Sequence, residues 1–269
     1  MSDWLHTLPI IWMTVLVFGL TYLIALAVLA MVTMLASEER MRSFKAISPG
    51  MLPPLGILFG LFVAFTAVQV WNDNDRATAA VDREASALRA VLILSATFPV
   101  ASQARLRSLI RGHIEEAAAR EWPSMAHQTA TLKIVPHYLA DALMLTLALT
   151  PGSEGQRLAQ REMAIELESA LDARRQRIII SRSQVGLLKW LCLFVQAASV
   201  LFAIALVHSD KPLASLIMLV VFATRAAACT LLILAYDRPF IGQLAVGPDP
   251  LPQVMPEVQS ITQAEPSHP

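Results

Sequence analysis

The sequence is short of charged residues. Only 16% of its 269 residues are Asp, Glu, Lys or Arg, whereas soluble domains carry about 25%. Hydrophobic residues make up 55% of the chain, and the mean hydropathy is +0.55. A single soluble core cannot bury that much apolar surface, so the composition predicts a membrane protein. The net charge of zero and the pI near 7.0 give no reason to expect a nucleic-acid partner.

The sequence also lacks the motifs that carry most enzyme chemistry. It contains no Gly-x-Ser-x-Gly, no His-Glu-x-x-His and no phosphate-binding glycine-rich motif. Its two cysteines, Cys192 and Cys229, stand alone inside apolar segments and are expected to be inert packing residues. His113 and Glu116 form an i,i+3 pair that could ligate a metal, but one such pair favours an ordinary polar contact. We therefore expect no enzymatic activity, no cofactor and no metal.

Four apolar runs are long enough to cross a bilayer core about 30 Å thick. They cover residues 9–36, 51–71, 187–208 and 213–236. The first is far longer than the apolar part of a signal peptide, so we interpret it as a retained anchor. Between the second and third runs, apolar residues recur at spacings of 3, 4 and 7, which predicts helices. No stretch alternates long enough to indicate a sheet, so the expected fold is all-α.

The expected organisation follows from these runs. Residues 1–36 form an N-terminal segment and the first transmembrane helix, and residues 37–71 form a link and the second. A helical domain at 72–186 precedes the third and fourth transmembrane helices at 187–236. The remaining residues, 237–269, form a Pro-rich tail that is expected to be flexible from about residue 247.

Prolines predict where the helices of the central domain end. Breaks are expected at Pro99, at Trp122-Pro123, near Pro136 and at Pro151-Gly152. The predicted helices therefore cover about 72–98, 102–121, 128–149 and 154–186.

The distribution of basic residues predicts the orientation. Four spans place both termini and the helical domain on the same side of the membrane. Near the span ends, this side carries Arg76, Arg83, Arg89, Arg174, Arg175, Arg177, Arg182 and Arg238, and the other side carries Arg40, Arg42, Lys45 and Lys211. Because cytoplasmic loops carry the excess of Lys and Arg, this side is expected to be cytoplasmic.

Local sequence around the second and fourth spans resembles a known family. The second span matches the bestrophin pattern of Pro, then Gly-x-x-Val, then Trp-Asn, at Pro54, Gly60, Val63, Trp71 and Asn72. After the fourth span, residues 237–242 (DRPFIG) are similar to the Pro-Phe-Gly segment of bestrophins, with one insertion. The central sequences AAVDREASALRAV and REWPSM resemble a bacterial bestrophin-like family of unknown function, and the resemblance covers about residues 51–250.

This resemblance implies an ion channel in the bacterial inner (cell) membrane. With the orientation predicted from the basic residues, it is a multi-pass protein with both termini cytoplasmic. Its expected partners are the lipid bilayer, small ions and copies of itself, possibly in a pentamer. Chloride-type anions are the default ions, and monovalent cations are the alternative. The second span lines the pore, with Pro53, Ile57 and Leu61 at the positions of the bestrophin neck, and the same spacing adds Phe65 to the row. The alternative is a packing stripe buried against the other spans of the same chain.

Other residues bear on ion conduction. Asn72, Asp73 and Asp75 follow the second span and would form an acidic pore mouth that favours cations, or merely a solvated helix entry. Arg225 is the one charge deep inside a span, where it would attract anions, contact another subunit, or reach lipid or a carbonyl. Arg174, Arg175, Arg177 and Arg182 precede the third span and indicate lipid contact or a basic vestibule.

The resemblance also has a limit. Bestrophins from animals follow Pro-Phe-Gly with an acidic run that helps to bind calcium, whereas this sequence continues as QLAVGP with only Asp249 nearby. We therefore expect no calcium gate of that kind. The alternative function is a membrane-anchored helical scaffold or sensor, in which the helical domain binds a partner.

Overall fold

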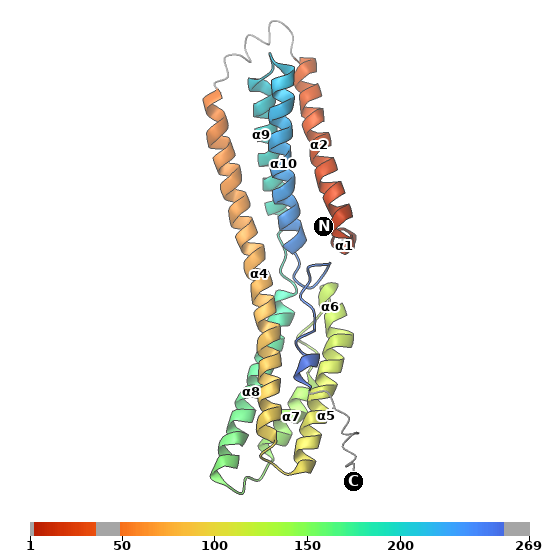
Figure 1. The fold of residues 1–269 in the computed structure, drawn as a ribbon, viewed down its shortest axis with the longest axis vertical. Helices are drawn as coiled ribbons and strands as arrows, with labels where there is room; N and C mark the ends of the chain where they lie inside the picture. Colours follow the sequence, from red (N-terminus) through yellow and green to blue (C-terminus); the bar gives the residue numbers. More distant parts are fainter. Residues whose placement is uncertain (1–2, 36–48, 256–269) are drawn as a thin grey trace, which may run out of the picture. The chain divides into compact units, whose positions relative to one another are not determined.

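The computed structural model describes residues 3–35 and 49–255 (Figure 1). It divides into two compact units. Within the described residues, the first comprises residues 3–35, 49–77, 125–128 and 179–246, and the second comprises residues 78–124, 129–178 and 247–255. Over the described residues both units are helical and contain no strand, as the sequence predicts.

The first unit contains the apolar helices. After the short α1 (Asp3–Thr7) come α2 (Ile10–Leu35), the first part of α4 (Leu52–Ser95), α9 (Leu187–Val207) and α10 (Pro212–Tyr236). All four long helices have the length and apolar composition needed to cross a membrane. Helix α10 packs against α2 and α9. Helix α4 joins the same core through Phe59, whose ring centroid lies 5.4 Å from that of Phe222 on α10. Of the predicted polar link at 37–50, residues 37–48 lie outside the described residues.

Helix α4 is shared by both units. It runs for 44 residues from Leu52 to Ser95, about 66 Å at the rise of an α-helix and more than twice the thickness of a bilayer core. Its apolar part ends near Trp71, and the remainder is polar. Apart from its first turn it contains no proline, and no glycine follows Gly60, so nothing in the backbone interrupts the helix where the apolar part ends.

The second unit is a bundle of shorter helices. The end of α4 is followed by α5 (Val100–Glu116), a π-helix (Ala117–Glu121), the start of α6 (Trp122–Ala126), α7 (His137–Leu147) and nearly all of α8 (Glu154–Ile180). Helix α5 packs against α7. The expected breaks at Pro99 and at Pro151-Gly152 lie between helices, as predicted.

The predicted break at Trp122-Pro123 is wrong. The chain stays helical through this point because it widens into the π-helix, in which the N–H of Trp122 bonds to the carbonyl of Ala117. Pro123 has no N–H and its ring would clash with the carbonyl of Ala119 in a regular α-helix. A wider π-turn relieves that conflict without ending the helix.

Two other boundaries differ from the predictions. Helix α7 begins at His137 and not at 128, because the N–H groups of Thr129 and Ala130 bond to the carbonyl of Ser124.

The predicted flexible tail is wrong for residues 247–255. There Leu251 and Val254 are buried, and Arg89 donates to the carbonyl of Gln253 over 3.2 Å. Residues 256–269 lie outside the described part.

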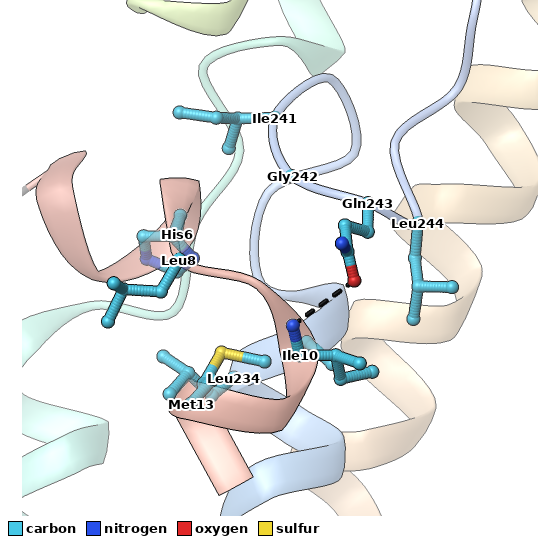
Figure 2. A pocket seen from close by; sticks show the side chains of 10 residues that line it. His6, Leu8, Ile10, Met13, Leu234, Ile241, Gly242, Gln243 and Leu244 are labelled. Atoms are coloured by element: carbon cyan, nitrogen blue, oxygen red, sulfur yellow. Dashed lines mark hydrogen bonds between the residues drawn. The ribbon is translucent and has the colours of Figure 1, made fainter. Parts of the chain in front are cut away.

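The segment after α10, which includes residues 241–244, contacts the N-terminal segment around residues 6–10 within the first unit (Figure 2). Asp237 accepts a hydrogen bond of 2.5 Å from the N–H of Val185, and Nε2 of His6 lies 3.7 Å from its other oxygen. Gly242 has φ +97°, and a Cβ there would lie 2.9 Å from the carbonyl oxygen of His6, so only glycine fits. The cavity at this contact is about 20 Å³, room for little more than one water.

Candidate functional site

The row predicted to line a pore lies on an exposed face of α4. Pro53 is exposed, and Ile57, Leu61 and Phe65 retain 67%, 51% and 68% of their accessible surface. The opposite face of the same helix is buried in the core of the first unit through Phe59, Val63, Ala67 and Val70. The described helices of the same chain therefore leave the row uncovered.

The residues at the predicted pore mouth have different surroundings. Asn72 is exposed. Asp73 accepts a hydrogen bond from the hydroxyl of Ser183 and lies 3.6 Å from Arg76. One turn earlier, Lys189 donates to the side chain of Gln69. The carboxylate of Asp73 is thus partly neutralised, and basic side chains flank it.

Arg225 lies near the middle of α10, on its exposed side. Among the residues that the structure describes, it makes no hydrogen bond or ion pair. An arginine at the centre of a membrane helix costs about 2.5–3.5 kcal/mol on insertion scales. A cost of this size favours a conformation or an assembly in which the guanidinium finds a partner.

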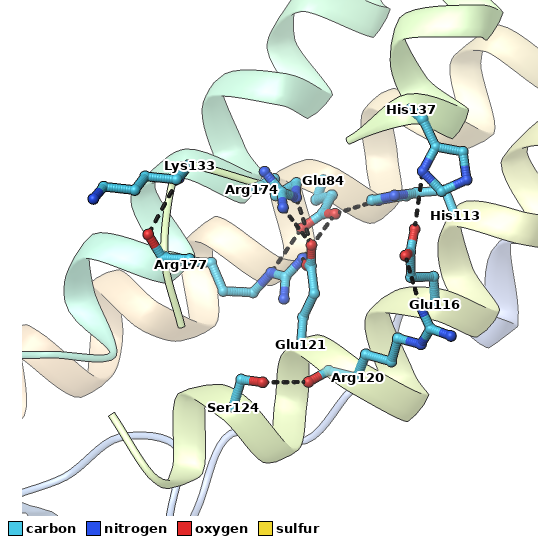
Figure 3. A network of polar contacts seen from close by, with 11 residues as sticks. Glu84, His113, Glu116, Arg120, Glu121, Ser124, Lys133, His137, Arg174 and Arg177 are labelled. Atoms are coloured by element: carbon cyan, nitrogen blue, oxygen red, sulfur yellow. Dashed lines mark hydrogen bonds and ion pairs between the residues drawn. The ribbon is translucent and has the colours of Figure 1, made fainter. Parts of the chain in front are cut away.

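The second unit contains a buried network of charged residues, drawn in Figure 3. Glu84 of α4 and Arg177 of α8 are fully buried and are joined by two hydrogen bonds of 2.9 and 3.1 Å. Nε2 of His113 lies 2.7 Å from Glu84, and Glu121 pairs with Arg177 at 2.8 Å and with Arg174 at 2.5 Å.

The last residue of the π-helix and the first residue of α6 both contact this network. Glu121 ends the π-helix, and Trp122 begins α6 with its ring 4.2 Å from the guanidinium carbon of Arg177. A cation over the face of a tryptophan ring is attracted by the ring electrons. The irregular turn around Pro123 therefore completes the surroundings of Arg177.

The network holds the Glu84 carboxylate in its charged form. Burial by itself raises the pKa of Glu84, but the positive charge of Arg177 and the hydrogen bond with His113 outweigh it and lower the pKa to about 2. Burial likewise opposes the charge of Arg177, and Glu84 and Glu121 overcome it and raise the pKa of the guanidinium. The charges are mutually satisfied, which favours a structural role.

This arrangement predicts acid sensitivity. A carboxyl whose pKa is 4.5 when unfolded and about 2 when folded binds more protons in the unfolded state throughout that window. The free energy of unfolding should therefore fall as the pH is lowered from 4.5 to 2. Thermal unfolding followed by circular dichroism at several pH values would measure this, with Glu84→Gln as the comparison. Equal pH slopes in both proteins would contradict the assignment.

The structure corrects the interpretation of the arginines before the third span. Arg174 and Arg177 contact neither lipid nor a vestibule, because both are buried inside the second unit. His113 pairs with Glu84, and not with Glu116 as a metal site would require. A cavity of about 130 Å³ borders Glu121 and Arg174, but both side chains already engage each other. No group of three potential metal ligands occurs among the described residues.

Comparison with known proteins agrees with this architecture. The order of the elements is that of a helical membrane protein. Two apolar helices come first, a polar helical block follows, and two more apolar helices come last. The family model of the Bestrophin-like domain matches residues 9–251. The chain belongs to this family, which confirms the resemblance inferred from the sequence. Bestrophins are known as channels and not as enzymes.

One solved structure has a similar fold. It is the crystal structure of a bacterial bestrophin homolog from Klebsiella pneumoniae that carries a point mutation. The TM-score is 0.69 at 11% sequence identity, and the match covers 90% of this chain and 97% of that chain. At this identity the likeness establishes the fold alone. No curated protein matches the sequence.

Proposed function

We propose that this protein is an ion channel in which several copies surround a pore lined by α4. The observation that carries the proposal is the exposed row Pro53, Ile57, Leu61 and Phe65, which the chain's other described helices leave uncovered. Its spacing of four places the row along one face of the helix. Closed cyclic symmetry turns one such row into successive apolar rings, and a narrow apolar ring gates by excluding water.

The expected ions are small, with chloride-type anions as the default for the family. The surroundings of Asp73 support this choice over cations, whereas the exposed carboxylate of Asp75, two residues further along α4, acts against it. The charge of Asp73 is balanced by Arg76 and shielded by the Ser183 hydroxyl, and Lys189 adds a second positive charge near the end of the span. An acidic ring that selects cations would need free carboxylates at this position.

The proposal includes the orientation and the domain boundaries predicted from the sequence. The helical domain and both termini lie in the cytoplasm, and the four spans cross the inner membrane of a bacterium. In this proposal the helical domain has no catalytic role. A scaffold or sensor that only anchors its helical domain would give the uncovered α4 row no function.

Recording from purified protein in planar bilayers tests the proposal. We expect discrete chloride currents from the wild-type protein, since the family and the uncovered row both point to conduction. The wild type, Ile57→Ala and Leu61→Ala are recorded after their oligomeric mass has been verified. The absence of current in all three would contradict the channel proposal.

A further inference from the structure

Two polar groups of the membrane helices lack partners among the described residues, and each offers what the other needs. Arg225 on α10 is an exposed guanidinium, which only donates hydrogen bonds. The side-chain oxygen of Gln196 on α9 is enclosed by protein and accepts no hydrogen bond. A buried acceptor without a donor is destabilising, and so is a charged donor facing hydrocarbon.

Gln196 lies at an open groove between α4 and α9. The groove has a volume of about 500 Å³ and is lined by five apolar residues of α4 between Leu55 and Phe65 and by Gln196, Ser199 and Val200 of α9. The hydroxyl of Ser199 already donates to the carbonyl of Val195. The Gln196 side chain lines this groove, so a rotation of its amide would bring the unmet oxygen to a donor inside the groove. The α4 wall of the groove includes Leu61 and Phe65, at the edge of the row proposed to line the pore.

Arg225 and Gln196 lie at the same depth in the membrane. Helix α9 ends at Val207 and α10 begins at Pro212, so the two helices form a tight antiparallel hairpin. Gln196 is about 11 residues before the end of α9, and Arg225 is about 13 residues after the start of α10. At 1.5 Å per residue, both stand roughly 17–20 Å from the hairpin.

The two residues of one chain do not meet. Helix α10 buries the face that carries Leu219, Ala223, Ala226 and Ala227, through which it packs with α2 and α9. Arg225 lies on the exposed side of α10, whereas the groove lies between α9 and α4. A partner for either group must therefore come from outside the subunit.

The geometry points to a contact between neighbouring subunits in which Arg225 of one copy enters the α4–α9 groove of the next and donates to Gln196. This inference rests on the proposed oligomeric channel. Rotation about an axis along the membrane normal preserves depth, so residues at equal depth in one chain can meet between copies. The contact joins two different surfaces, as expected of an interface that closes into a ring.

Disulfide crosslinking tests this contact. In a Cys192→Ala/Cys229→Ala background, Arg225→Cys and Gln196→Cys are combined and oxidised in nanodiscs with a membrane-permeant oxidant. We expect a ladder of crosslinked species up to the closed ring. The matched control pairs Gln196→Cys with Val221→Cys, which is exposed on α10 one turn away, about 6 Å different in depth. The control should crosslink several-fold less.

The outcomes separate this contact from the channel itself. Native mass spectrometry measures the oligomer. If it shows an oligomer and the two cysteine pairs crosslink equally, the contact between Arg225 and Gln196 is wrong and the pore proposal is unaffected. A monomer in lipid would overturn both. Gln196→Leu provides a second measurement without cysteines. It should fold as the wild type does, and the oligomer should dissociate at lower detergent concentration. Unchanged dissociation would also count against the contact.

Discussion

Replacing Arg177 with methionine is expected to lower the free energy of unfolding by about 3–5 kcal/mol, because the change leaves the fully buried Glu84 without its main counter-charge. Removal of one partner of a buried ion pair costs far more than the pair contributes over an apolar replacement. Chemical denaturation in detergent micelles, followed by circular dichroism, would measure the change.

The chain offers a matched control for this substitution. Arg175 lies on the same helix but is exposed, so Arg175→Met should change the free energy of unfolding by about 0.5 kcal/mol or less. Adding Glu84→Leu to Arg177→Met should recover part of the loss, since no carboxylate then remains unpaired at that position. If Arg177→Met and Arg175→Met lowered the free energy of unfolding equally, the charged network would not stabilise the fold.

Trimming the apolar row on α4 is expected to increase conductance. Leu61→Ala removes three heavy atoms from each subunit and so widens every ring that Leu61 forms in the oligomer. A wider apolar constriction is easier to hydrate, and lowering the barrier by about 1.4 kcal/mol would raise the current on the order of tenfold. Single-channel recording at fixed voltage would measure it.

The control is the same chemical change on another membrane-exposed surface. Leu191 on α9 retains 56% of its accessible surface and lies outside the row, so Leu191→Ala should leave the conductance unchanged. Equal effects at Leu61 and Leu191 would show that the row has no special relation to the conduction path.

Periodicity and composition were sufficient to predict most of the fold. The four apolar helices and their order follow from hydropathy, which depends only on the sequence. The exposure of Ile57 and Leu61 could not be predicted, because a spacing of four describes a buried stripe and an exposed one equally well. Only the positions of α2, α9 and α10 show which face of α4 remains uncovered.

The charged network could not be predicted from the sequence, for a related reason. Glu84 stands in the apolar stripe of α4, flanked at helical spacing by the buried Val81 and Leu88. A carboxylate in a buried stripe is itself a signal that a cation must lie opposite, because an unpaired buried charge is not tolerated. Nothing in the sequence indicated which arginine this was. Arg177 is one of several near the end of α8, and the turn that brings Glu121 and Trp122 beside it depends on an irregular helix at Pro123.

The most direct test of the central proposal is the access of water to the α4 row in the working channel. In the background without native cysteines, Ile57→Cys and Leu61→Cys channels would be recorded while a charged, water-soluble thiol reagent is applied, with the buried Val63→Cys as the control. We predict that the reagent changes the current through Ile57→Cys and Leu61→Cys and leaves the current through Val63→Cys unaffected. Conducting channels whose current does not respond at Ile57 or Leu61 would show that ions take another path.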